Sequence, residues 1–434
     1  MQEILKTIIL DFQELELETG IQRQLQIEHL SGKATVCIGV RRSGKSTYMM
    51  QIIQKLLNEG VSKDNIVYIN FFDDRLHNLQ QKGLGEILDA YYSLYPQKKN
   101  SEKVFFFFDE IQSVIGWESF VERLQRTEKC EIYITGSSAH LLSKEIATQM
   151  RGRALSWEIF PFSFPEYLSY KSIKLTQHLS TKNKLIVKNA FEEYWESGGF
   201  PEVLGLSKNL RIKIHQEYLH AILFRDLIER YDISHPKALS DLTHKLLDNI
   251  SSFYSINNLS NHLRSLGSKI TKEVVSDYIK WIEDAYLLFS VRLFDASITR
   301  SNANPKKIYC IDHSFIKSTS SGILLNSGHL LENLVFTTLR RTYPDIYYYK
   351  TKNRREVDFI TQSQDRSLKL YQSCETLADP QTRKREVSAL VEAMKELNLK
   401  SGIIITRNEE EQISDGDLII NVIPIWHFLL DYPI

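Results

Sequence analysis

The first third of the chain alternates short apolar runs with segments of helical periodicity. Residues 35–38 form one apolar run, and residues 48–57 repeat apolar side chains at helical spacing. Residues 104–108 are a second, continuous apolar run, and residues 131–138 read as another short strand closed by small polar residues. Strands that are apolar at every position are typical of parallel sheets covered on both faces. The pattern therefore predicts an α/β domain with a parallel sheet over residues 1–168.

The rest of the chain changes character twice. Residues 169–240 are helical and rich in aromatic and charged side chains, which predicts a lid or connector. Residues 241–312 read as helix, turn, helix and strand, with Gly267 as a helix stop and Thr271 as an N-cap. That order is typical of a winged helix. Residues 313–434 again mix strands and helices and form the last predicted domain. The apolar face of the first of the two helices holds Ile256, Leu259, Leu263 and Leu266.

A glycine-bounded loop joins the first apolar run to the first helix and matches a phosphate-binding loop of the P-loop NTPase fold. Its glycines let successive N–H groups and the helix N-terminus point at phosphate oxygens. Lys45 is expected between the β- and γ-phosphates, and the Ser46 hydroxyl is expected to ligate Mg²⁺. A plain glycine turn is the alternative. The loop consists of Gly39, Val40, Arg41, Arg42, Ser43, Gly44, Lys45, Ser46 and Thr47.

The second apolar run ends in two carboxylates, Asp109 and Glu110. A central strand delivers its last residues to the carboxyl edge of the sheet, where ligands bind in open α/β folds. We expect Asp109 to hold the hydration shell of Mg²⁺ opposite Ser46, and Glu110 to orient and deprotonate the attacking water. A loop start or helix cap is the plain alternative. The chain has no guanine-reading N-K-x-D sequence, so ATP is favoured over GTP as the nucleotide.

Two further positions are weaker candidates for the same site. Thr135 closes the third strand and can act as a sensor of the γ-phosphate, with Ser137 as the second choice; a polar turn explains both equally well. Arg153, in the run Arg151-Gly152-Arg153, can stabilise transition-state charge in its own subunit or in a neighbour's. A solvated basic loop is an equal alternative for that arginine.

Four segments together resemble a widespread prokaryotic family of AAA-like, STAND-related ATPases. They are GVRRSGKST at 39–47, FFFFDEIQ at 105–112, TGSS at 135–138 and RGR at 151–153. Residues 160–167, 198–202 and 224–231 extend the resemblance over nearly the whole chain. It implies ATP binding and hydrolysis. In that family the C-terminal part, of unknown function, is a winged helix joined to a restriction-endonuclease-like PD-(D/E)xK domain.

The second helix of the predicted winged helix argues against base reading. Base readout favours Arg, Lys, Asn and Gln, and phosphates repel acidic groups. Acids outnumber bases at the positions expected to be exposed, so we favour packing against neighbouring domains. These positions are Lys272, Glu273, Ser276, Asp277, Lys280, Glu283 and Asp284.

The resemblance places metal-binding carboxylates of the last domain at Glu332 and Asp358. Such a pair can hold Mg²⁺ and activate water for phosphodiester cleavage. Cys374 stands where the family pattern has lysine, Gln372 is a weaker ligand than a carboxylate, and Lys369 lies outside the pattern. We therefore expect a degenerate domain that binds rather than cuts, with a weak or vestigial metal site and its two carboxylates close together. Alternatively, Glu332 caps its helix and Asp358 lies in a solvated strand.

Basic and aromatic residues alternate over residues 340–355, a composition that suits phosphates and stacked bases. A solvated hairpin face explains the same charges, so nucleic acid is a partner that we consider but do not favour. Across the 434 residues, 54 Lys and Arg balance 54 Asp and Glu, which removes any global electrostatic argument for nucleic acid.

Composition otherwise indicates an ordinary cytoplasmic protein. The four cysteines show no C-x-x-C spacing, which favours reduced thiols over disulfides or zinc. No run of 18 or more apolar residues occurs, so no membrane span is predicted. The first residues also lack the order of a signal peptide.

Together these patterns predict a Mg-dependent protein that binds and hydrolyses ATP and works as a nucleotide-driven switch. ATP would reposition the C-terminal domains, with a protein partner or an oligomer as the recipient of the change. One alternative is an ATP-gated nucleic-acid-binding or nuclease protein. The other is an ATP-binding interaction protein with very slow turnover.

Overall fold

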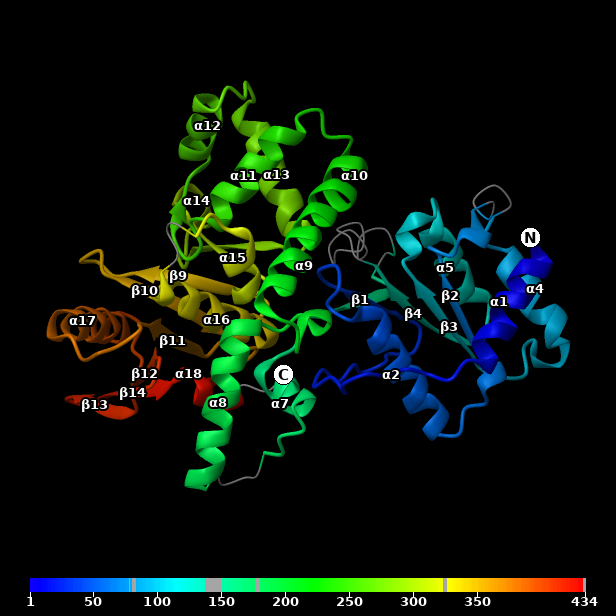
Figure 1. Ribbon diagram of the computed structural model, residues 1–434, viewed down its shortest axis with the longest axis horizontal. Coiled ribbons are helices and arrows are strands. Elements are labelled where there is room, and N and C mark those ends of the chain that lie inside the picture. Colours follow the sequence, from blue (N-terminus) through cyan, green and yellow to red (C-terminus); the bar gives the residue numbers. More distant parts are fainter. Residues whose placement is uncertain are drawn as a thin grey trace. The chain divides into compact units, whose positions relative to one another are not determined.

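The computed structural model divides into two compact units, residues 1–160 and 161–434 (Figure 1). It describes residues 1–77, 79, 83–136, 150, 152–175, 180–322 and 326–431. The predicted boundaries at 168, 240 and 312 remain predictions. One sheet of the second unit includes strands from both sides of residue 312.

The sheet of the first unit is parallel. Among the described residues, five strands pair in the order β2-β3-β4-β1-β5, and each neighbouring pair is parallel. The carboxyl ends of β1, β3 and β4 therefore share one edge. This is the P-loop NTPase sheet that the sequence predicts. The strands are β1 (Ala34–Ile38), β2 (Ile66–Asn70), β3 (Val104–Asp109), β4 (Cys130–Thr135) and β5 (Ala154–Glu158).

Helices cover both faces of this sheet, which explains why β3 is apolar throughout. Phe107 stacks on Tyr133 in a core cluster with residues of α1 and α2. On the opposite face, Phe106 meets Tyr91 of α4 and Phe108 meets Phe120 of α5. Alternate side chains of one strand thus enter two cores. The helices are α1 (Gln2–Glu14), α2 (Lys45–Asn58), α4 (Glu86–Leu94) and α5 (Trp117–Thr127).

The second unit begins with helices, drawn in green in Figure 1. A π-helical segment, Ile222–Ile228, joins α9 to α10. The helices up to the first strand are α7 (Phe164–Tyr170), α8 (Thr181–Ser197), α9 (Lys208–Ala221), α10 (Glu229–Tyr231) and α11 (Pro236–Leu247). Those that follow it are α12 (Ile256–Ser265), α13 (Lys272–Asp284), α14 (Ile298–Ala303), α15 (His313–Thr319), α16 (Ser327–Thr342), α17 (Pro380–Glu396) and α18 (Ile425–Asp431).

A mixed sheet runs through the second unit. Among the described residues, nine strands pair in the order β13-β14-β12-β11-β10-β9-β7-β8-β6. Strand β7 pairs with β8 antiparallel and with β9 parallel, so it joins the two halves of the sheet. The strands are β6 (Phe253–Tyr254), β7 (Leu288–Leu293), β8 (Lys306–Cys310), β9 (Ile346–Lys350), β10 (Glu356–Gln362), β11 (Leu368–Ser373), β12 (Ser401–Thr406), β13 (Glu411–Asp415) and β14 (Leu418–Pro424).

The predicted pair of helices forms α12 and α13, with two differences. Gly267 adopts a left-handed φ of 86° after α12, and Thr271 caps α13 by accepting a hydrogen bond from Val274 N. Leu266, which we expected in the apolar face, is 47% exposed because α12 ends just before it. Glu283, expected to be exposed, is only partly so and accepts a hydrogen bond from a backbone N–H of β7. Within the described part of the chain, no helix is both long and apolar enough to cross a membrane.

Candidate functional site

The loop from Gly39 to Thr47 links β1 to α2 at the carboxyl edge of the parallel sheet. Gly39 has a φ of 146°, and a Cβ there would lie 2.3 Å from the carbonyl oxygen of Ile159, so only glycine fits. Gly44, with a φ of 93°, directly precedes α2. The turn leads the chain into the first turn of a helix, whose N–H groups suit a phosphate.

Lys45 is folded over its own loop and is 5% exposed. Its Nζ donates to the carbonyl oxygens of Gly39 at 3.1 Å and of Val40 at 3.0 Å. Both acceptors are uncharged. Phosphate oxygens can therefore replace them, since charge-assisted hydrogen bonds are the stronger ones.

Asp109 ends β3 and is 1% exposed. Two hydroxyl groups from the flanking strands hold its carboxylate: Tyr68 on β2 donates to Oδ2 at 2.7 Å, and Thr135 on β4 donates to Oδ1. Burial and the Asp109 charge raise the pKa of Tyr68, so its hydroxyl keeps the donated proton. The sequence pattern indicates Thr135 but not Tyr68, because a tyrosine inside a strand is usually predicted to pack in the core.

Glu110 leaves the strand with φ 56° and ψ 38°, the left-handed region. Its N–H donates to Thr135 Oγ1 at 3.3 Å, and its carboxylate accepts from the Gln112 side-chain amide. A non-glycine residue in this conformation costs about 1–3 kcal/mol, and such residues cluster at functional sites. The structure thus brings Asp109, Glu110 and Thr135 together at one strand edge.

Arg153 lies at the other edge of the sheet. It directly precedes β5, which runs parallel to β1, and its carbonyl oxygen accepts from Ala34 N at the start of β1. Its guanidinium contacts Glu122 at 3.3 Å. Within its own subunit Arg153 thus lies away from the edge that holds the phosphate-binding loop. Its contribution to a neighbouring subunit stays a prediction, with a solvated basic loop as the alternative. Ser137 and Arg151 lie outside the described residues.

Arg23 is a buried residue that the motifs did not reveal. Its guanidinium donates to the carbonyl oxygens of Ser43 at 2.9 Å and of Phe160 at 2.6 Å. Its N–H donates to Gln51 of α2. The arginine therefore ties the segment before β1 to the phosphate-binding loop. No spacing pattern links a lone arginine to a loop 16 to 24 positions later in the sequence.

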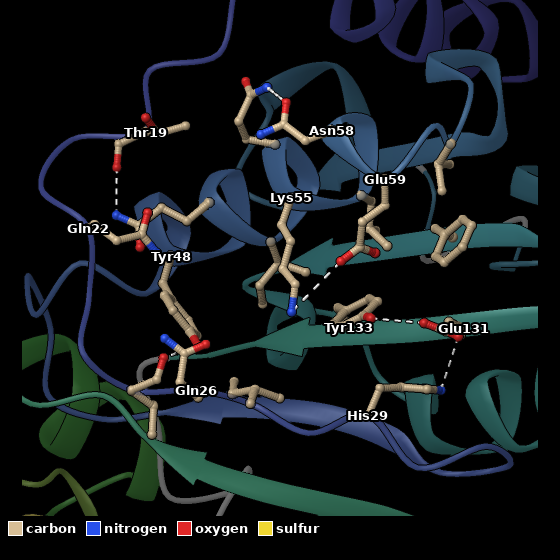
Figure 2. Close-up of a pocket in the computed structure, with 18 of the residues that line it drawn as sticks. Thr19, Gln22, Gln26, His29, Tyr48, Lys55, Asn58, Glu59, Glu131 and Tyr133 are labelled. Carbon is tan, nitrogen blue, oxygen red and sulfur yellow. Dashed lines mark hydrogen bonds and ion pairs between the residues drawn. The ribbon is translucent and has the colours of Figure 1, made fainter.

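A hollow of about 720 Å³ lies along α2, lined by the segment 19–29 and by the starts of β3 and β4 (Figure 2). Figure 2 shows that Glu131 accepts a hydrogen bond from Tyr133 and contacts His29. Lys55 of α2 forms an ion pair with Glu59, four positions later, also drawn in Figure 2. Because β3 and β4 are parallel, the part of this hollow at their amino ends is away from the edge that holds the loop.

A second charged cluster lies in the C-terminal unit, and it contains both predicted carboxylates. Lys307 Nζ lies 2.8 Å from Glu332 Oε1 on α16 and 3.0 Å from Asp358 Oδ1 on β10. Glu356 Oε1 lies 2.6 Å from the same nitrogen. The expected approach of Glu332 and Asp358 is therefore seen. The expectation that the site lacks a cation is wrong, because Lys307 of β8, 3% exposed, supplies one.

The carboxylates of this cluster accept further hydrogen bonds from the protein. Tyr309 donates to Glu332 Oε1 at 2.6 Å. The backbone N–H and the hydroxyl of Ser373 both donate to Asp358 Oδ2, each at 2.9 Å. Burial, followed by the charge of Asp358, raises the pKa of Glu332 to about 8. Neither residue matches its plain alternative, a helix cap or a solvated strand, since both are buried.

Gln372 and Cys374 do not point to a metal. The Gln372 Oε1 accepts the N–H of Asp358 at 3.1 Å, and its amide donates to Glu386 of α17 at 2.6 Å. Cys374 belongs to an apolar cluster that includes Val357, and burial raises the pKa of its thiol to about 12. At the position where the family pattern has lysine, Cys374 therefore packs in the apolar core.

The aromatic side chains of residues 340–355 are used inside the fold. Tyr348 is fully buried and donates to the carbonyl oxygen of Pro305 at 2.6 Å. Tyr349 donates to Glu396 at 2.7 Å, and Tyr347 meets Phe294 edge-on. Tyr348 is therefore not available to stack on bases, whereas Tyr347 and Tyr349 are partly exposed, and nucleic-acid binding by this segment stays a prediction that we do not favour.

Three family models match the chain in sequence. Residues 31–168 match an AAA domain, residues 188–322 match a domain of unknown function (DUF8612), and residues 327–428 match another (DUF4143). An uncharacterized protein of Methanocaldococcus jannaschii is 36% identical over 99% of this chain and 96% of its own length. The chain belongs to this family of AAA-domain proteins with a C-terminal DUF4143 domain.

An uncharacterized protein of Haemophilus influenzae is 30% identical to this AAA-domain protein over 77% of the chain and 80% of its own length. Among solved structures, the Aeropyrum pernix ORC2 protein has 13% identity and a TM-score of 0.36, covering 79% of this chain and 93% of its own. The ORC1 protein of the same organism, in complex with DNA, has 14% identity and a TM-score of 0.30, covering 67% and 87%. Structural likenesses this weak add no argument. The AAA domain identifies a nucleotide-binding protein of the ATPase type.

Proposed function

We propose that this protein is a Mg-dependent ATPase that works as a nucleotide-driven switch. The observation that carries the proposal is the meeting of the loop lysine, Asp109, Glu110 and Thr135 at one edge of the parallel sheet. A phosphate cradle next to buried and strained carboxylates suits phosphoryl transfer to water.

The residues at this edge divide the work. Ser46 and Asp109 would hold Mg²⁺, and the fit is chemical, because Mg²⁺ prefers oxygen ligands and two hydroxyl groups orient the Asp109 carboxylate. When bound, Mg²⁺ neutralises charge on the β- and γ-phosphates. Lys45 adds a cation to the same phosphates. Glu110 orients and deprotonates the attacking water, and Thr135 senses the γ-phosphate while it steadies Asp109.

Several features of the proposed switch lie outside this edge. We place Arg153, the candidate for stabilising transition-state charge, in the site of a neighbouring subunit, which makes the active form an oligomer. The α11–α13 region with its strands is proposed as a winged helix that packs rather than reads DNA. The last domain, proposed as restriction-endonuclease-like, binds rather than cuts. The cytoplasm is the proposed location.

Turnover by Glu110→Gln tests the proposed chemistry. The amide keeps the shape of the side chain and removes its basicity, so ATP hydrolysis should fall by about 10²–10⁴-fold while ATP binding persists. Glu118→Gln, on α5, is the matched control and should keep the wild-type rate. Unchanged turnover in Glu110→Gln would make Glu110 structural and shift the role to Asp73 or Asp74.

The ATPase rate, measured with and without nucleic acid, distinguishes the switch from its alternatives. The switch predicts the same ATPase rate with and without DNA or RNA, whereas stimulation would favour an ATP-gated nucleic-acid protein. Negligible turnover with tight ATP binding would favour an interaction protein. Plasmid, single-stranded DNA and RNA should stay intact with Mg²⁺ or Mn²⁺, with or without ATP. Cleavage that is lost in Asp358→Ala would overturn the binding role of the last domain.

A further inference from the structure

The carboxylates of the last domain do not fit a divalent metal. Lys307 and the Ser373 donors occupy both oxygens of Asp358. Lys307 and Tyr309 share Glu332 Oε1. Within the part of the chain that the structure describes, no group of three or more His, Cys, Asp or Glu is placed to hold a metal ion. The ammonium group stands where a nuclease-like site would need its metal.

Opening this cluster for a metal is costly. Lys307 is 3% exposed, and moving it would leave buried carboxylates without their cation. A metal would also have to displace the Ser373 hydrogen bonds from Asp358. Both steps oppose metal binding, while the Lys307 cluster as it stands is satisfied without one.

A cavity of about 910 Å³ lies over this cluster, and basic side chains gather in its lining. Two acidic residues of the lining already have partners within the protein: Glu356 pairs with Lys307, and Glu386 pairs with Gln372 and Arg385. Glu375 is the lining acid that opposes an anion. The basic residues of the lining other than Lys307 are Arg354, Arg355, Lys384 and Arg385. Arg355 pairs with Glu392 and Arg385 pairs with Glu386, but both guanidinium groups are exposed enough to exchange these partners for a phosphate.

Two long helices also begin at this cavity. Residues of the first turns of α16 and α17, 16 and 17 residues long, contribute to its lining. Helix N-termini carry partial positive charge, which adds to the arginines and the lysine of the lining. Guanidinium groups bind phosphate through paired hydrogen bonds. The lining therefore suits a phosphate group better than a cation.

We propose that this cavity binds a phosphate group without a divalent metal, with Lys307 as the internal cation in the metal's place. The inference is independent of the proposed ATPase, because no residue of the first unit enters it. Free phosphate compounds and a nucleic-acid backbone share this chemistry, and the test separates them.

The binding test uses the full chain carrying Lys45→Ala, which removes the phosphate-binding lysine of the first unit. Labelled 12-nucleotide single-stranded DNA and RNA are followed by fluorescence anisotropy, and pyrophosphate by calorimetry, in EDTA and in Mg²⁺. We expect equal affinity in both buffers for at least one of these probes. Adding Lys384→Gln should weaken it about tenfold, the effect of one lost charge-assisted contact. Lys400→Gln, beyond the other end of α17, should leave it unchanged.

The outcomes decide both the site and its ligand. Binding of pyrophosphate identifies a site for small phosphate compounds, and binding of the oligonucleotides alone identifies a backbone site. Binding that requires Mg²⁺, binding unaffected by Lys384→Gln, or no binding of any probe would overturn the proposal.

Manganese binding tests the role of Lys307 separately. Electron paramagnetic resonance of Mn²⁺ with the same Lys45→Ala chain should show no Mn²⁺ ion bound through Asp358. Adding Asp358→Ala should therefore leave the spectrum unchanged. A tight Mn²⁺ ion that disappears in Asp358→Ala would overturn the assignment of Lys307 as the internal cation. Lys307→Met, if it folds, should gain Mn²⁺ affinity; if it does not fold, the wild-type Lys307 measurement still decides.

Discussion

Each unit of this AAA-domain protein places a buried lysine near buried acids, but the two lysines have different partners. Lys45 donates to two carbonyl oxygens of its own loop, and nearby Asp109 is held by hydroxyl groups. Lys307 instead lies within 3.0 Å of three carboxylates. The first lysine can exchange uncharged partners for phosphate oxygens, whereas the second already neutralises the acids around it.

The difference separates the site that we propose for Mg-ATP from one that already holds its own cation. At the first, hydroxyl donors from β2 and β4 orient the Asp109 carboxylate. At the second, the cation is built in. Counting lysines and acids alone would treat the two sites as equals, and the partner of each lysine decides between them.

Lys307→Met should produce the largest change in this comparison. Removing the cation leaves the buried Asp358 without its cation and, above the Glu332 pKa of about 8, a second buried carboxylate as well, so the free energy of unfolding of the second unit should fall by about 3–5 kcal/mol at pH 9. Urea unfolding followed by circular dichroism measures the loss. Lys306→Met is the matched control on the same strand: burial lowers the Lys306 pKa, so its ammonium is not stabilised there, and the change should be small.

A small effect of Lys307→Met, equal to that of Lys306→Met, would break the comparison. It would mean that the carboxylates near Lys307 are solvated or protonated and need no cation. The C-terminal cluster would then resemble the Asp109 site in being open.

Thr135→Val should have the next largest effect, on ATP turnover. It removes one hydroxyl donor to the Asp109 carboxylate, and hydrogen bonds to charged groups contribute about 1.5–3 kcal/mol, or roughly 10–100-fold in rate. Rates measured over a range of Mg²⁺ concentrations should show a higher Mg²⁺ requirement. Thr127→Val, at the exposed end of α5, should behave as wild type. An unchanged Mg²⁺ requirement would show that Thr135 does not orient Asp109.

The chain order of the residues explains what sequence could predict here. Residues 39–47 and Asp109-Glu110 are contiguous, and strand, loop and helix follow directly, so local spacing identifies the loop and the acidic strand. The carboxylates Glu332 and Asp358 were found by resemblance. Lys307 was missed because it lies 25 positions before Glu332, on a strand whose neighbours in the sheet come from distant sequence.

The alternation of side chains along β9 explains why not every tyrosine of the 340–355 segment is available to a ligand. Side chains of a strand point to opposite faces, so a run of three tyrosines in β9 must send at least one into the core. Tyr348 is that residue. The position of Arg153 could not be predicted for a different reason, since the sequence does not tell whether a loop residue lies at the amino or the carboxyl edge of its sheet.

Arg23→Met should have the smallest effect of this series, on nucleotide affinity. The substitution keeps an apolar stem and removes the hydrogen bonds to the carbonyl oxygens of Ser43 and Phe160. A loss of about 1–2 kcal/mol corresponds to roughly a tenfold weaker dissociation constant for ATP. Arg126→Met, exposed on α5, is the control. Equal affinities for the two variants would show that Arg23 does not shape the loop.

The melting temperature with Mg-ATP, measured for wild type and for Lys45→Ala, tests directly whether the phosphate-binding loop binds nucleotide through Lys45. Ligand at 100 times its dissociation constant stabilises the folded state by about 2.7 kcal/mol, a shift of roughly 5–10 °C for a unit of this size. We expect that shift for wild type and none for Lys45→Ala, whose fold without ATP should melt as wild type does. An equal shift in both proteins, or no shift in wild type, would contradict this expectation.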